Sequence, residues 1–319
     1  MQVPSHVEYE RARSVDHALE LLARFGPESR VLAGGHSLIP MMKLRLAQPE
    51  TLIDINGVSG LSRITVADGE LRIGALVRHA QLLASPLAGR HFPILHDAEQ
   101  VIADPIVRNW GTIGGSLCQA DPSEDLSAAF GALRATAVIQ GRDGPRQVPV
   151  REFHLGPYET VVAPDELLTE LRVPIRPGPG GKNSSKAAGK NSKGGGKDGG
   201  KDGSCGGSAY EKVARRVGDW SVAAAGAMLV LDADGAVAEV GIGLAAVGAR
   251  HFVAAGAEDF LRGGPAGEAA FARAGQIAAE HCQPAADQRG PVDYKRHLTG
   301  ELTTRALRRA AARARDQEA

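Results

Sequence analysis

Two glycine-bearing segments of this chain have the residue types that bind phosphate groups. The first runs from Ala33 to Leu38 and the second from Thr112 to Ser116, and each follows a strand-like or apolar stretch. Glycine permits a sharp turn with positive φ and a close backbone approach, so consecutive N–H groups can point at anionic oxygens. Ser37 and Thr112 add a hydroxyl donor beside each glycine pair. One Gly-Gly pair is more often a tight turn, but two such segments predict a shared diphosphate site.

Short strands and helices are expected to position these segments. Apolar triplets and quartets bounded by Gly, Asp or Asn favour strands, whereas apolar residues at helical spacing favour helices. A helix over 17–23 has Ser14 or Asp16 in place to cap it. The N-terminal half is therefore α+β or α/β, with strands at 30–32, 51–54 and 71–74 and helices at 17–23, 79–84 and 125–133.

A low-complexity stretch separates this half from the rest of the chain. Residues 178–207 are almost wholly Gly, Lys, Ser, Asn and Asp, which cannot bury enough apolar surface to offset the entropy of ordering, so a flexible linker is expected. Beyond it, three strands predict a small antiparallel sheet with helices covering one face. The strands are expected at 209–215, 222–231 and 237–245, and the helices at 255–261, 268–281 and 300–315.

Composition narrows the class of protein. The 319 residues suffice for two or more domains, and 37 basic against 37 acidic side chains give no overall field that would attract nucleic acid or a membrane surface. Cys118, Cys205 and Cys282 stand far apart, which predicts reduced thiols and no zinc site or iron–sulfur cluster. The first residues lack a signal-peptide pattern and no apolar run is long enough to span a membrane, so a cytoplasmic protein is expected.

Two further glycine patterns resemble nucleotide-binding motifs only faintly. Gly178–Asn183 has Asn183 where a P-loop needs Ser or Thr, and no strand-to-helix frame surrounds it. Gly241, Gly243 and Gly248 depart from the dinucleotide fingerprint because the third glycine is displaced and the segment continues as strand, so close packing of the strand explains them better. No Ser, His and Asp arrangement supports hydrolysis, and no residue is assigned a catalytic or metal-binding role.

The residues around the two segments resemble a known family. AGGHSLIPMMKLRL at 33–46, TLIDI at 51–55, IADPIVRNW at 102–110 leading into TIGG, and DPSEDL at 121–126 are similar to the FAD-binding medium subunit of molybdenum hydroxylases. The strongest likeness is to aerobic carbon monoxide dehydrogenase medium subunits, and it continues through AYEK at 209–212 and RRVGDW at 215–220. The resemblance covers nearly the whole chain except residues 178–207.

The resemblance implies a fold and a division into domains. It implies an α+β architecture: a two-part FAD-binding domain of the PCMH or vanillyl-alcohol-oxidase-like type, followed by a small C-terminal domain with a three-stranded antiparallel sheet and helices. The expected domains are 1–177, with a subdomain break near 56–60, and 208–319, joined by the linker at 178–207.

The resemblance also implies site residues for FAD. Asp125 matches an acidic position that contacts flavin-nucleotide hydroxyls, although capping a helix over 126–133 explains it equally well. Ile102 and Leu167 or Leu168 match apolar positions that flank the flavin ring, or are core, and Tyr210 matches an aromatic position near the isoalloxazine, or packs within its strand. The expected FAD-binding residues are Ala33, Gly34, Gly35, His36, Ser37, Leu38, Ile102, Thr112, Ile113, Gly114, Gly115, Ser116, Asp125, Leu168 and Tyr210.

The function that the resemblance implies is electron transfer. A flavin accepts single electrons and releases two together, which suits the end of an iron–sulfur relay. The implied partners are a large subunit with a molybdenum cofactor and a small subunit with two-iron clusters, in a dimer of heterotrimers that reduces an external acceptor. Cys205 stands alone in the linker region, so no extra cluster is expected. A stand-alone flavoprotein oxidase or dehydrogenase and a flavin-free assembly subunit are the alternatives.

Overall fold

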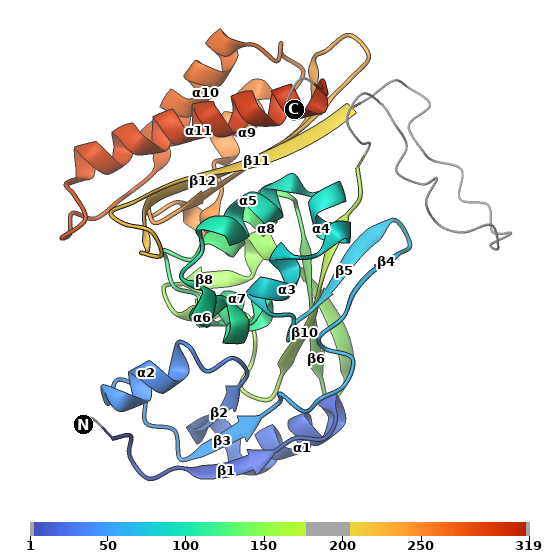
Figure 1. Ribbon diagram of the computed structural model, residues 1–319, viewed down its shortest axis with the longest axis vertical. Helices are drawn as coiled ribbons and strands as arrows, with labels where there is room; N and C mark the ends of the chain where they lie inside the picture. The colour runs from blue at the N-terminus through green and yellow to red at the C-terminus, as the bar shows by residue number, and fades with distance from the viewer. Residues whose placement is uncertain (1–2, 177–204, 317–319) are drawn as a thin grey trace, which may run out of the picture. The chain divides into compact units, whose positions relative to one another are not determined.

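The structure, a computed structural model, describes residues 3–176 and 205–316, and its contacts divide the chain into two compact units (Figure 1). The first unit contains Met1–Ser85, Ala103–Asp121 and Ala135–Val173, and the second contains Pro86–Ile102, Pro122–Arg134 and Pro174–Ala319. The two units are therefore interleaved along the sequence. Division of the chain into domains at residues 177 and 208 stays a prediction.

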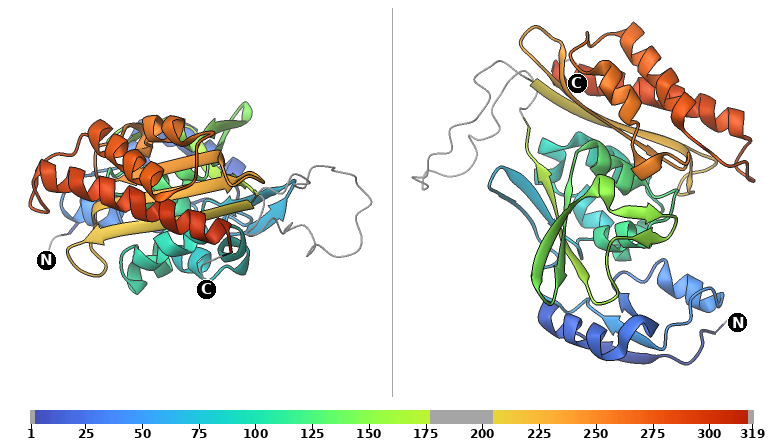
Figure 2. Two further views of the ribbon diagram at one scale, coloured as in Figure 1. Left: turned by 90° about the horizontal axis from the view of Figure 1, so that it is seen from above. Right: turned by 180° about the vertical axis from the view of Figure 1, so that it is seen from behind.

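The first unit begins with a small parallel sheet that carries the first glycine segment. Its strands lie in the order β1–β3–β2, and α1 packs against them (Figures 1 and 2). The Ser14 hydroxyl accepts from the His17 N–H at 3.0 Å, so Ser14 is the cap of α1. The elements are β1 (Glu8–Arg11), α1 (Val15–Phe25), β2 (Ser29–Leu32), α2 (Leu38–Lys43) and β3 (Thr51–Asp54).

A five-stranded sheet and short helices complete this unit. The strand order is β4–β5–β10–β6–β7, and buried Leu71, Ile73 and Leu171 contribute to its core. A two-stranded ribbon, β8–β9, lies apart from this sheet. The elements are β4 (Ile64–Ala67), β5 (Glu70–Gly74), α3 (His79–Leu83), α6 (Pro105–Trp110), α7 (Ile113–Gln119), β6 (Thr136–Gly141), β7 (Gly144–Pro149), β8 (His154–Gly156), β9 (Glu159–Thr160) and β10 (Leu167–Pro174).

The second unit is built on the antiparallel sheet β11–β12–β13, as the sequence predicts. Its strand β11 begins at Cys205, so Cys205–Gly207 pair with β12 and are not linker; the remainder of the predicted linker, with the P-loop-like residues Gly178–Asn183, lies outside the described residues. The elements are α4 (Pro86–His91), α5 (Pro93–Val101), α8 (Asp125–Ala132), β11 (Cys205–Ala214), β12 (Ser221–Leu231), β13 (Val237–Ala245), α9 (Ala255–Leu261), α10 (Glu268–His281) and α11 (Val292–Ala314).

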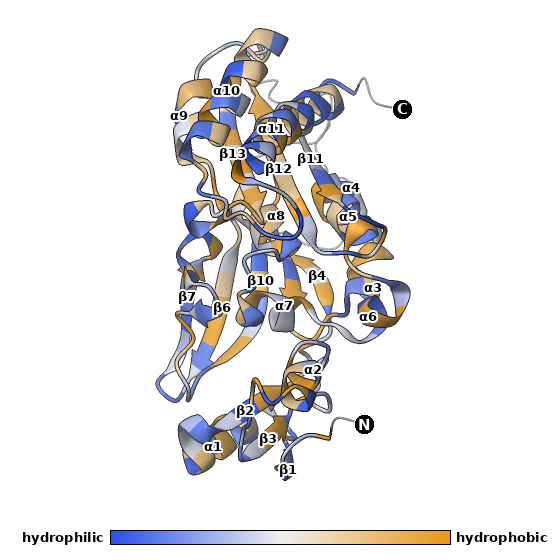
Figure 3. Ribbon diagram, turned by 90° about the vertical axis from the view of Figure 1, so that its left-hand side faces the viewer, coloured by the Kyte–Doolittle hydropathy of each residue, from blue (hydrophilic) through white to orange (hydrophobic). Residues whose placement is uncertain are grey.

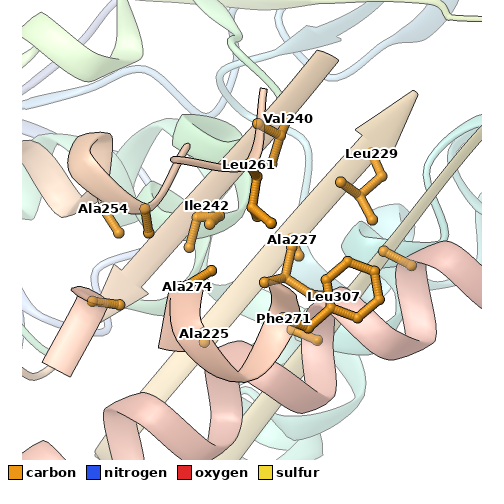
Figure 4. Packing of buried hydrophobic residues seen from close by; sticks show 14 of the residues in the cluster. Ala225, Ala227, Leu229, Val240, Ile242, Ala254, Leu261, Phe271, Ala274 and Leu307 are labelled. Atoms are coloured by element: carbon orange, nitrogen blue, oxygen red, sulfur yellow. The ribbon is translucent and has the colours of Figure 1, made fainter. Parts of the chain in front are cut away.

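Helices cover both faces of this sheet, where the sequence pattern predicted one. On one face Ala225, Ala227 and Leu229 of β12 pack with Phe271 of α10 and Leu307 of α11 (Figure 4). α5 and α8 pack against the other face. Every residue of β12 is buried because both faces of the strand are covered, and its nearly continuous apolar sequence suits that burial. The ribbon of α11 alternates between hydrophilic and hydrophobic colours, as expected of a helix with one solvated face (Figure 3).

Glycines of β13 allow helix α8 to approach that second face closely. A Cβ built at Gly241 would lie 1.9 Å from the Ala132 carbonyl oxygen, and one at Gly243 would lie 1.9 Å from that of Ala128. Both distances are far below a van der Waals contact, so neither position accepts a side chain without movement of α8. Close packing, and not a nucleotide fingerprint, accounts for these glycines.

No helix in the described parts of the chain combines the length and the apolar character that crossing a membrane requires.

Candidate functional site

The first glycine segment turns sharply between β2 and α2. Gly35 has a φ of +73°, which other residues adopt only with strain. Ser37 is the N-cap residue of α2, and its side chain makes no capping bond there. Across residues 3–176 and 205–316, no acceptor faces the amides of Gly34, Gly35, His36, Ser37 and Leu38. Consecutive N–H donors without acceptors in a half-buried turn are what an anionic oxygen needs.

His36 lies on the outside of this turn. Its side chain is exposed, and its Nδ1 is 3.0 Å from the Gly34 carbonyl oxygen. Within the described residues, no group of three or more His, Cys, Asp or Glu side chains is arranged to hold a metal ion. The contact of His36 with the Gly34 carbonyl is a hydrogen bond within its own loop.

The second segment differs from the expectation that it also offers bare amides. It opens helix α7, with Thr112 as the cap: the Thr112 hydroxyl accepts from the Gly115 N–H at 3.1 Å, and its carbonyl accepts from the Ser116 N–H at 2.9 Å. The N–H groups of Ile113 and Gly114 donate to the carbonyls of Val77 and Ala75, both at 2.9 Å. These amides are therefore occupied, because the segment is docked on residues 75–77.

Gly114 is needed for that docking. A Cβ built there would lie 2.6 Å from the Cβ of Ala75. The Thr112 O–H is one donor that this segment still offers, since its oxygen serves the cap as an acceptor only. The second segment thus contributes a hydroxyl and a fixed helix terminus, while the first contributes the free amides.

The structure brings the two segments together. A Cβ built at Gly34 would lie 2.3 Å from the Trp110 carbonyl oxygen and 2.9 Å from the Gly111 Cα, so the first segment packs directly on the residues that precede Thr112. Only a glycine at position 34 permits this approach. Two parts of the chain that are more than 70 residues apart in the sequence therefore lie next to each other within one compact unit.

Two residues that the sequence reasoning missed connect the segments. The Asn56 side-chain amide donates to the Ala33 carbonyl at 2.8 Å, and its Oδ1 accepts from Arg78 Nη2 at 2.6 Å. Arg78 Nη1 in turn donates to the Trp110 carbonyl. Asn56 could have been noticed as a polar residue directly after the strand 51–54, but nothing in the sequence marks Arg78.

Asp125 and Tyr210 meet in the second unit. Asp125 is the first residue of α8, and the cap is Glu124, whose carboxylate accepts from the N–H groups of Leu126 and Ser127 at 2.8 and 2.6 Å. The reading of Asp125 as the helix cap is therefore wrong. Its Oδ1 instead accepts from the Tyr210 hydroxyl at 2.9 Å.

Two more side chains complete this buried cluster. Ser221 donates to Asp125 Oδ1 at 2.7 Å, and Lys212 Nζ lies 2.8 Å from Oδ2. Burial, together with the charge of Asp125 and the hydrogen bond to it, raises the pKa of Tyr210 well above its ordinary value, so the phenol keeps its proton and donates it to the carboxylate. A Cβ built at Gly226 would lie 3.1 Å from the Tyr210 ring, so this glycine makes room for the ring.

The two apolar candidates occupy ordinary positions. Ile102 follows α5 as its C-cap residue, is half-buried and donates its N–H to the Ala98 carbonyl at 3.1 Å. Leu168 is buried in β10 opposite Ile139. Contacts of Ile102, Leu168, Asp125 and Tyr210 with a cofactor stay predictions.

Comparisons with known proteins identify the family. The family model described as the FAD binding domain in molybdopterin dehydrogenase matches residues 5–176, and that of the CO dehydrogenase flavoprotein C-terminal domain matches residues 208–310. A carbon monoxide dehydrogenase medium chain from Hydrogenophaga pseudoflava is 38% identical over 312 residues, which is 98% of this chain and 99% of that one. The 6-hydroxypseudooxynicotine dehydrogenase complex subunit alpha of Paenarthrobacter nicotinovorans is 32% identical over 98% of this chain and 97% of its own.

Solved structures agree over the same length. The carbon monoxide dehydrogenase from Hydrogenophaga pseudoflava that lacks the Mo-pyranopterin moiety of its cofactor matches with a TM-score of 0.86, covering 98% of this chain and 99% of that chain. Quinoline 2-oxidoreductase from Pseudomonas putida 86 matches at 30% identity with a TM-score of 0.83, covering 98% and 99%.

The residues present fit the cofactor of these families. FAD carries a diphosphate, whose oxygens need several N–H or O–H donors, and the first glycine segment offers consecutive amides that have no acceptor in the described chain. The chain therefore belongs to the FAD-binding medium subunits of the molybdenum hydroxylases, an oxidoreductase family that includes the carbon monoxide dehydrogenase medium chains, and FAD is its cofactor.

Proposed function

We propose that this chain is the electron-transfer subunit of a heterotrimeric molybdenum hydroxylase. In this role it receives electrons from the iron–sulfur clusters of a small partner subunit and delivers them to an external acceptor. A large partner subunit with a molybdenum cofactor oxidises the substrate, and two heterotrimers associate into a dimer. The observation that carries the proposal is that the first glycine segment, with its row of free amides, packs directly against the residues that precede the second.

The range of the relatives supports a role that does not depend on one substrate. Over nearly its full length the chain is similar to medium chains or subunits of carbon monoxide dehydrogenase, nicotine 6-hydroxylase and glyceraldehyde dehydrogenase. A subunit that recurs beside such different reactions is suited to a task that they share. Binding a flavin and relaying electrons is such a task.

The chain's own contribution is to bind and orient the cofactor. FAD, when bound, supplies redox chemistry that passes between one- and two-electron steps. We propose that the amides of Gly34–Leu38 and the Thr112 hydroxyl hold its diphosphate. They need no cationic side chain for this, because backbone N–H groups aimed at one point carry enough partial positive charge.

The proposed site is tested in the apoprotein. Gly35→Val forces a β-branched residue into a positive φ and brings side-chain atoms near Ile39 and Leu32, whose side chains lie 3.2 and 3.3 Å from a Cβ built there. We expect a loss of FAD binding in isothermal titration, whereas Gly26→Ala, another positive-φ glycine with open space around it, keeps it. Equal FAD affinity in Gly35→Val and the wild type would refute the assignment of this segment.

The proposed role is tested by purification from the native host through a tag on this chain. We expect two companion chains, one larger and one smaller, together with molybdenum, iron and FAD. Removing this chain should leave substrate-dependent bleaching of the iron–sulfur absorbance but abolish turnover with the natural acceptor. Substrate turnover by this chain alone would favour a stand-alone flavoprotein and overturn the proposal.

A further inference from the structure

We propose that Arg78 and Asn56 are positioning residues for the cofactor: together they form a side-chain strut that fixes the spacing of the two glycine segments. This inference rests on the proposed role of those segments in holding FAD. Neither side chain belongs to a segment itself, and all the groups involved lie in the first compact unit.

The strut is a closed ring of contacts. From the first segment, the Ala33 carbonyl accepts from Asn56 Nδ2 at 2.8 Å; Asn56 Oδ1 accepts from Arg78 Nη2 at 2.6 Å. Arg78 Nη1 donates to the Trp110 carbonyl, the same oxygen that a Cβ at Gly34 would strike. The ring therefore joins both segments through one carbonyl, and a change in the length of either side chain must move one segment against the other.

Each end of the strut is anchored. The Asn56 N–H and Nδ2 both donate to Asp54 Oδ1 at 2.7 Å, and Tyr9 donates to Asp54 Oδ2 at 2.5 Å, so the asparagine is tied to β3 and β1. The Arg78 guanidinium lies over the Trp110 ring, 5.9 Å from its centroid. The fork of the guanidinium allows one side chain to meet the Asn56 and Trp110 acceptors together, which a lysine ammonium on a flexible stem does poorly.

A purely structural role for Arg78 is the competing explanation, and the location of its contacts argues against that role. Arg78 is half-buried, and burial lowers the pKa of its guanidinium. Holding a cation at this position therefore has a desolvation cost that an apolar side chain would avoid. The contacts made in return go to Trp110, which precedes the second segment, and to Asn56, which binds the Ala33 carbonyl of the first. We infer that the strut holds free amides and the Thr112 hydroxyl at the spacing that one diphosphate requires.

The test measures FAD and ADP affinity of the apoprotein by isothermal titration, because ADP carries the diphosphate without the flavin ring. Arg78→Met should weaken both by a similar factor, about 10- to 100-fold, as expected for loss of hydrogen bonds to a charged group. Arg78→Lys should not restore the affinity, since it keeps the charge without the fork. Asn56→Ala should add little further loss in the double variant, because the two residues act as one unit.

Arg146→Met is the matched control. Arg146 also donates to a carbonyl, that of Val161 at 2.6 Å, and to a side chain, Glu166, in the same unit but away from the glycine segments. It should lose stability without losing FAD affinity. Wild-type affinity in Arg78→Met, or full rescue by Arg78→Lys, overturns the positioning role.

Failure of this inference is distinguishable from failure of the proposed site. If Gly35→Val abolishes FAD binding while Arg78→Met binds normally, the site stands and the strut is wrong. If both variants bind FAD as the wild type does, the site itself is wrong. Should Arg78→Met not fold, the single variant Asn56→Ala, which removes the donor to Ala33 and Asp54 and the acceptor of Arg78 without adding a charge, must still lower the affinity for both ligands.

Discussion

Replacing Lys212 by methionine should destabilise the second unit far more than the loss of an exposed ion pair would. Lys212 Nζ lies 2.8 Å from Asp125 Oδ2 and 3.1 Å from the Val101 carbonyl oxygen, and the two charged side chains are only 3% and 6% exposed. Removing the ammonium leaves a buried carboxylate without its counter-charge. Tyr210 and Ser221 still donate to Oδ1, but neutral hydroxyls do not replace a cation.

The expected cost follows from that burial. Breaking a buried pair by removing one partner typically costs about 3–5 kcal/mol. At roughly 2–4 °C per kcal/mol for a domain of 150–250 residues, the melting temperature should fall by about 6–20 °C. The Arg308–Glu268 pair is the matched control, since its side chains are 54% and 62% exposed. Arg308→Met should cost no more than about 1 kcal/mol.

The assay is thermal unfolding of the apoprotein, followed by circular dichroism and calorimetry. Adding Asp125→Asn to Lys212→Met should recover part of the loss, because the amide is neutral and its oxygen can still accept from Tyr210 and Ser221. Equal shifts in Lys212→Met and Arg308→Met would show that the buried pair is not the stabilising feature that its geometry indicates.

Two further changes have clear expected outcomes. Gly243→Ala should lower the free energy of unfolding in urea by about 1–3 kcal/mol, because its Cβ would overlap the Ala128 carbonyl. Gly89→Ala in α4 has open space around it and should raise that free energy by up to about 1 kcal/mol. A change of the same sign in both variants would contradict the packing argument. Hydrogen bonds from Arg146, opposed by burial, lower the pKa of Glu166 below its ordinary value of 4.5. The ionised carboxylate therefore stabilises the protein above pH 4.5, and this stabilisation is lost as the pH falls through the folded-state pKa. The urea midpoint of Arg146→Met should therefore lie below that of the wild type at pH 7 and converge with it toward pH 3, and a constant gap would exclude the ion pair as the cause.

Local patterns predicted some of the helices and strands closely. The residues of α9 and α10 agree with the sequence prediction, as does the strand 237–245, because apolar spacing and turn residues act over a few positions. Contacts at long range were not predictable in the same way. Helices α5 and α8 come to the β11–β13 sheet from positions about 100 residues earlier, and helices were predicted on one face only. The apolar run of β12 was the signal that could have indicated two covered faces.

The candidate site was predicted in part. The glycine types and the hydroxyls beside them identified both segments, and Gly34 explains their contact. Whether an individual amide stays free depends on which other part of the chain packs against it. The sequence therefore could not show that the N–H groups of Ile113 and Gly114 donate to residues 75–77. The strut was not predicted because Asn56 and Arg78, which are 22 positions apart in the sequence, meet only through their side chains.

The interleaving of the two units constrains the order in which a nascent chain can complete them. All residues of the first unit have been synthesised once Val173 has left the ribosome, whereas the second still awaits β11–β13 and α9–α11. Until then, α5 and α8 have no sheet to cover and their apolar faces are open to chaperones or to wrong partners. Equally, a fragment starting at residue 208 would present a sheet with one bare face, so it should aggregate unless the peptides 86–102 and 122–134 are supplied in trans.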